Sequence, residues 1–61
     1  MPRPEREEQL AVEISELFRR LEAEEDVWTR SDVRREIAAR LAAAPGLRED
    51  FAEALAEHPE I

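Results

Sequence analysis

The sequence predicts an all-α fold in which three short amphipathic helices form a small helical bundle. Apolar residues recur at spacings of three and four over three consecutive stretches, and proline or cap-forming residues separate these stretches. This spacing places the apolar side chains of each stretch on one face of a helix. The chain has 61 residues, so we expect one small domain with helices at roughly residues 4–24, 30–44 and 46–58.

The first predicted helix begins near Pro4, because a proline suits the first turn but cannot donate a hydrogen bond inside a helix. Pro2 and Pro4 together indicate an entry segment, that is, non-helical chain that leads into the first helix. Acidic residues gather at 24–26, where the helix dipole disfavours negative charge, so the helix should end near residue 24. Its apolar face consists of Leu10, Ile14, Leu17, Phe18 and Leu21.

The start of the second helix is predicted from a cap and an apolar contact. Thr29 is a favourable N-cap residue, and Asp32 follows it at the spacing of a capping box. Trp28 precedes the cap and would pack against Val33 as a hydrophobic staple. The apolar face of this helix continues through Val33, Ile37, Leu41 and Ala44.

The third helix follows a turn at Pro45 and Gly46, which ends the second helix at Ala44. Pro59 then stops the third helix, and Ile61 remains in phase with its apolar face. That face is predicted to contain Leu47, Phe51, Ala54, Leu55 and His58.

Small size makes the stability of a single copy marginal. A chain of this length buries only about 60% of the surface that its unfolded form exposes. Ten of its apolar residues are alanines, so large core side chains are few. The three helices therefore form either a closed bundle or an open one that a second copy completes, and we expect a homodimer.

Charge is distributed unevenly along this acidic chain, whose net charge is -7. Residues 29–44 have a net charge of +2, whereas the segments on both sides are strongly acidic. The basic middle could pair with acidic residues of the same chain, with a second copy or with another acidic protein. Trp28 is explained by the staple, although Trp is also enriched in binding hot spots. We assign partner binding to Trp28, Arg30, Arg34, Arg35 and Arg40.

The side chains available for catalysis are few. The chain has one His and no Cys, and its basic residues are all Arg. We therefore expect no enzyme activity and no cofactor. Glu57, His58 and Glu60 lie close in sequence, but consecutive residues of a helix do not share a face, so we predict no metal site and interpret His58 as a helix-terminal residue.

These observations predict a small acidic module for protein–protein interaction or assembly. The alternative is a helix-turn-helix regulator that would bind DNA through the arginines of the middle helix. Nucleic acid is the less favoured partner, because the helix after the Gly-containing turn is mostly acidic. The N-terminus lacks the apolar segment of a signal peptide and no stretch is long enough to span a membrane, so we expect a cytoplasmic protein.

Overall fold

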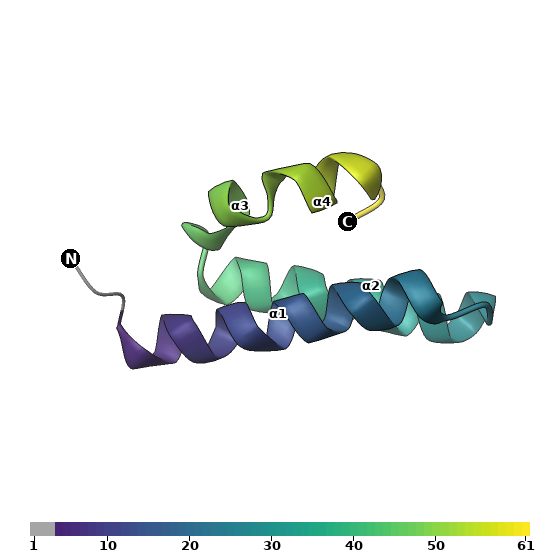
Figure 1. Ribbon diagram of the computed structural model, residues 1–61, viewed down its shortest axis with the longest axis horizontal. Coiled ribbons are helices and arrows are strands. Elements are labelled where there is room, and N and C mark those ends of the chain that lie inside the picture. The colour runs from purple at the N-terminus through teal and green to yellow at the C-terminus, as the bar shows by residue number, and fades with distance from the viewer. Residues whose placement is uncertain (1–3) are drawn as a thin grey trace.

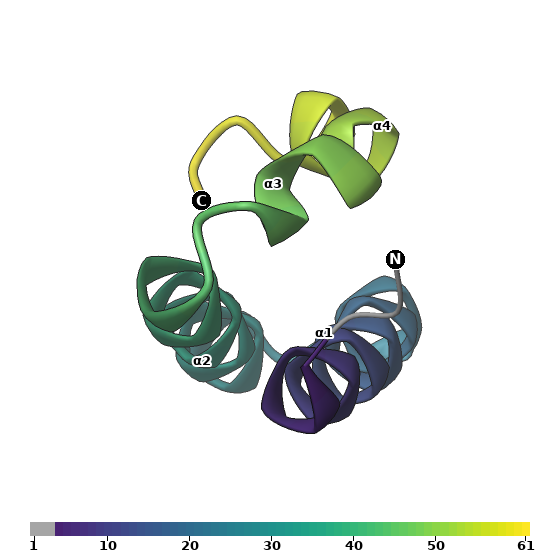
Figure 2. The same ribbon diagram turned by 90° about the vertical axis from the view of Figure 1, so that its left-hand side faces the viewer.

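The computed structural model describes residues 4–61, and all of its regular secondary structure in that range is helical. The helices are α1 (Glu5–Ala23), α2 (Val27–Ala43), α3 (Leu47–Asp50) and α4 (Ala52–Glu57). Helices α1 and α2 lie side by side in opposite directions, and α3 and α4 run back above them (Figure 1). Viewed from the end, α3 and α4 lie over the junction between the two long helices (Figure 2). The all-α prediction is confirmed, while Pro2 of the expected entry segment lies outside the described residues.

Both ends of α1 agree closely with the sequence prediction. Pro4 occupies the N-cap position, and its carbonyl oxygen accepts hydrogen bonds from the backbone N–H groups of Glu7 and Glu8 at 3.0 and 3.1 Å. Acidic residues in this first turn complement the positive end of the helix dipole. At the other end Glu24 adopts an extended conformation, with φ -83° and ψ 130°, and α1 stops before it.

The predicted start of α2 is wrong by three residues, because Asp26 and not Thr29 is the N-cap. One carboxylate oxygen of Asp26 accepts a hydrogen bond from the backbone N–H of Trp28 at 3.3 Å, and the other accepts one from the Thr29 hydroxyl at 2.8 Å. A carboxylate also interacts favourably with the positive end of the helix, which Thr cannot do. The earlier start places Trp28 inside the first turn with 82% of its surface exposed, so the predicted staple with Val33 does not form.

This cap leads to a first prediction. Asp26→Ala should lower the free energy of unfolding by about 1 kcal/mol, because it removes the acceptor for the first turn of α2. Thr29→Ala should be nearly neutral, because the higher helix propensity of Ala offsets the loss of one exposed hydrogen bond. Urea unfolding followed by circular dichroism measures both. A larger loss for Thr29→Ala than for Asp26→Ala would contradict the assignment of the cap.

The end of α2 agrees with the prediction, but the third predicted helix is divided. Ala44, which precedes Pro45, has φ -140° and ψ 75°, outside the helical region as expected before proline. Phe51 has φ -111° and ψ 21° and separates α3 from α4. Its ring stacks on that of Phe18 in α1 with 5.8 Å between the centroids. This tertiary contact, rather than a proline or glycine, accompanies the interruption of the helix.

The core is formed by the predicted apolar faces. No polar or charged residue is buried within the described chain. Leu10, Leu17, Phe51 and Leu55 are partly buried and pack against the core. The buried residues are Ile14, Phe18, Leu21, Val33, Ile37, Leu41, Ala44 and Leu47.

Candidate functional site

Arg40 connects the two long helices. Its Nε donates a hydrogen bond to Oε1 of Glu13 in α1 at 2.8 Å, and its Nη1 donates to the backbone carbonyl of Glu36 at 3.1 Å. The hydrogen bond from Arg40 is the main cause that lowers the pKa of the Glu13 carboxyl, with a second contribution from Gln9. Arg40 is thus engaged within the chain and is a poor contact for a partner.

Arg30 and Arg34 are also engaged within the chain. Arg30 donates from Nη1 to the backbone carbonyl of Glu24 at 3.2 Å, next to the end of α1. Arg34 lies 3.8 Å from Oε1 of Glu60, measured from its Nη1. The pKa of the Glu60 carboxyl is lowered first by a hydrogen bond from its own backbone, with smaller effects of Arg34 and His58. The basic middle of the sequence therefore pairs largely with acidic or carbonyl groups of the same molecule.

Arg35 is the one predicted arginine whose side chain is directed to solvent. It is exposed and forms no ion pair with any residue in the range 4–61. Together with Arg20 of α1, it borders a shallow surface hollow of about 520 Å³. The other residues that line this hollow are Thr29, Asp32, Val33 and Glu36.

Two apolar side chains are exposed at the start of α2. Trp28 is 82% and Val27 71% exposed. Trp28, Asp32 and Arg35 follow each other at spacings of four and three, so they share one face of the helix. Figure 1 shows that the turn between α1 and α2 extends beyond α4, so the C-terminal helices leave this end of the molecule uncovered. We refer to Val27, Trp28 and Arg35, with Arg20 beside them, as the Trp28 surface.

The sequence prediction included only Trp28 and Arg35 of this surface. Val27 was missed because the second helix was expected to begin after it, and an Asp26 cap would have been the signal to include it. Arg20 was missed because its place beside Arg35 depends on how α1 packs against α2.

Comparison with protein-family models, curated proteins and solved structures finds no match to this chain. Among the described residues, no helix combines the length and the apolar character that crossing a bilayer requires.

Proposed function

We propose that this protein is a non-catalytic module for protein–protein interaction, and that it binds through the Trp28 surface. The observation that carries the proposal is the exposure of Val27 and of Trp28, the single Trp of the chain. Trp28 shares its face of α2 with Arg35, which has no ionic partner in the described part of the molecule. Trp and Arg are the residue types most enriched in binding hot spots.

The apolar and charged residues of the Trp28 surface would have different roles. Burial of Trp28 and Val27 would supply most of the affinity, because removal of apolar area from water contributes about 25 cal/mol per Å². Arg20 and Arg35 would orient an acidic counterpart and accelerate association, since exposed ion pairs contribute only about 0–1 kcal/mol each.

A second copy of the chain is the counterpart that we propose to test first. The acidic residues at the start of α1 provide a surface of opposite charge to Arg20 and Arg35. The apolar faces from which the sequence predicts a dimer pack against one another within one chain, where their side chains are buried or partly buried. Self-association would therefore use the Trp28 surface instead. The net charge of -7 opposes the approach of two copies, and the local pairing of arginine with carboxylate must overcome this repulsion.

The structure offers less support for the DNA-binding alternative. The segment in the position of a recognition helix is divided into α3 and α4, of four and six residues. Its only basic residue is Arg48, against the acids Glu49, Asp50, Glu53 and Glu57. A continuous helix with base-reading side chains is what a helix-turn-helix protein inserts into the major groove.

Two measurements together test the proposal: sedimentation, which gives the mass of the protein in solution, and the fluorescence emission of Trp28. We expect the mass to rise toward that of a dimer with concentration, and the Trp28 emission to shift to the blue over the same range as the indole leaves water. Trp28→Ala should prevent the rise in mass, whereas Val12→Ala, at another exposed apolar position, should not. A monomer with solvent-exposed Trp28 at every concentration would overturn self-association.

Two variants of equal net charge distinguish the local pairing of Arg35 with a carboxylate from the overall repulsion between two acidic copies of the chain. Arg35→Glu should weaken the dimer more than Arg19→Glu, which changes an exposed arginine of α1 outside the Trp28 surface. Equal weakening by the two variants would show that Arg35 has no specific role. Titration with random duplex DNA at low salt tests the alternative, since strongly salt-dependent binding would favour the regulator.

A further inference from the structure

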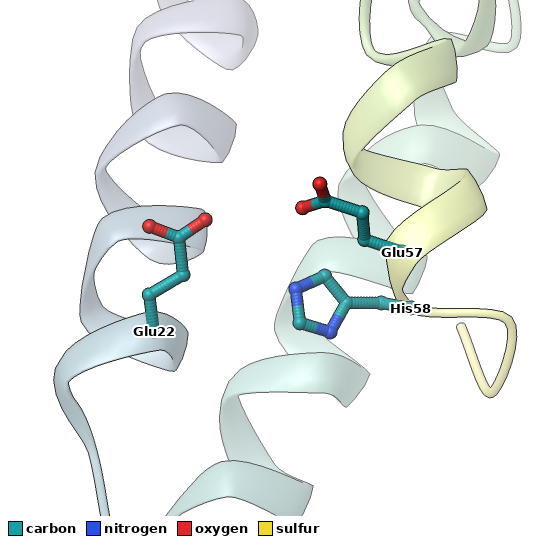
Figure 3. Close-up of side chains that lie close together, drawn as sticks. All are labelled: Glu22, Glu57 and His58. Atoms are coloured by element: carbon teal, nitrogen blue, oxygen red, sulfur yellow. The ribbon is translucent and has the colours of Figure 1, made fainter.

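Three potential metal ligands meet where the end of α1 approaches the end of α4. They are Glu22, one residue before the last of α1, Glu57, the last residue of α4, and His58, which follows it. One ligand atom of each residue lies within 4.8 Å of the others. Figure 3 shows the two carboxylates and the imidazole directed toward a common space between the helices.

The backbone at His58 explains why two consecutive residues can face this space. His58 has φ -127° and ψ 68°, so it has left the helical conformation that Glu57 still has. The argument that neighbouring helical residues point in different directions therefore does not apply to this pair. Glu22 comes from 35 positions earlier in the sequence, and only the packing of the folded chain brings it here.

The imidazole of His58 is held in an orientation that suits a ligand. Its ring lies 5.9 Å from the ring of Phe18, and only 13% of the side chain is exposed. Nδ1 lies 3.7 Å from Oε1 of Glu60. In Figure 3 the other ring nitrogen of His58, Nε2, is directed toward the carboxylate of Glu22. A carboxylate beside one nitrogen while the other faces a metal is the usual arrangement around metal-binding histidines.

We propose that Glu22, Glu57 and His58 bind one Zn²⁺ ion, with water completing its coordination. Two carboxylates balance the charge of a divalent cation, and the imidazole nitrogen favours Zn²⁺ over Mg²⁺ or Ca²⁺. Ligand distances of about 2.0–2.2 Å around a tetrahedral ion require the donor atoms to approach by roughly 1 Å. Both glutamates are exposed, and rotation about their side-chain bonds can provide this movement.

The bound ion would link the C-terminal segment, residues 47–61, to α1. Among the described residues, the contacts between residues 47–61 and α1 include the stacking of Phe18 on Phe51 and a tilted ring contact of Phe18 with His58. A ligand that binds only the folded state raises its stability by mass action, so the melting temperature should rise with the concentration of free Zn²⁺. This site is separate from the Trp28 surface, and the proposal does not depend on the proposed function.

The test uses the full chain without a polyhistidine tag. Calorimetric titration with Zn²⁺ gives the affinity, and the imidazole signals in an NMR spectrum identify the ligand, because the chain contains one His. We expect the His58 signals to shift with Zn²⁺ and to remain unchanged with Mg²⁺ at the same concentration. His58 signals that do not respond to Zn²⁺ would overturn the proposal.

Conservative variants of exposed acids provide the matched controls. Glu22→Gln and Glu57→Gln should each weaken Zn²⁺ binding by at least about tenfold, since loss of even an indirect partner of a metal ligand has an effect of this size. Glu25→Gln and Glu53→Gln remove the same charge at exposed positions outside the cluster and should leave the affinity unchanged. Equal effects of all four variants would indicate diffuse attraction to an acidic surface and would overturn the site.

Discussion

Ile37→Ala should reduce the free energy of unfolding by about 2–5 kcal/mol and move the midpoint of urea unfolding to a clearly lower concentration. Ile37 is fully buried in the middle of α2. Its truncation removes apolar contacts and leaves a cavity that the surrounding side chains fill only in part. A domain of this length is stable by roughly 3–9 kcal/mol, so one such cavity uses much of that margin.

Urea unfolding followed by far-ultraviolet circular dichroism measures this loss. Fluorescence is less suitable, because Trp28 is 82% exposed in the folded chain and its surroundings change little on unfolding of a monomer. Val12→Ala is the control, since Val12 is 51% exposed on α1 and its truncation should change stability by less than about 0.5 kcal/mol. Similar losses for the two variants would contradict the assignment of Ile37 to the core.

Helical periodicity was sufficient to predict most of the core. Residues at spacings of three and four, such as Ile14, Phe18 and Leu21, are buried because a helix places them on one face. Such spacing does not identify which polar residue caps a helix. Asp26 and Thr29 both have the required chemistry, and here one carboxylate receives bonds from both the backbone and the Thr29 hydroxyl.

The division of the third helix could not be predicted from local sequence. Residues 47–58 contain neither glycine nor proline, and their apolar spacing is that of one continuous helix. Phe51 departs from helical geometry where its ring meets Phe18, 33 positions earlier in the chain. Local helix propensity cannot predict this contact, because the contact depends on how α1 packs against residues 47–61.

The candidate sites show the same difference between local and long-range information. The arginines of α2 are visible as a basic segment in the sequence, but their partners Glu13 and Glu60 come from other parts of the chain. The packing leaves Arg35 without an ionic partner in the range described. Glu22 likewise joins Glu57 and His58 only in the folded molecule, so their shared location could not be derived from spacing alone.

Phe18→Ala should lower the free energy of unfolding by about 3–5 kcal/mol, because Phe18 supports both the core and the C-terminal segment. Its side chain is buried, and its ring contacts those of Phe51 and His58. Phe18→Leu keeps most of the apolar volume and removes mainly the ring contacts, which for an aromatic pair contribute about 0.5–1.5 kcal/mol. The Phe18→Leu variant should therefore fold, but α4 should detach from α1 more often than it does in the parent protein.

Amide hydrogen exchange of Phe18→Leu distinguishes this local effect from a general loss of stability. The amide of Leu55, which donates to the carbonyl of Phe51 at 2.9 Å, should exchange faster than in the parent protein. Amides in the middle of α2, around Ile37, should lose less protection, because the packing of α2 against α1 remains. An equal loss of protection at Leu55 and Ile37 would show instead that the C-terminal segment and the helix pair open as one unit, so that Phe18 stabilises the whole domain rather than the attachment of α4.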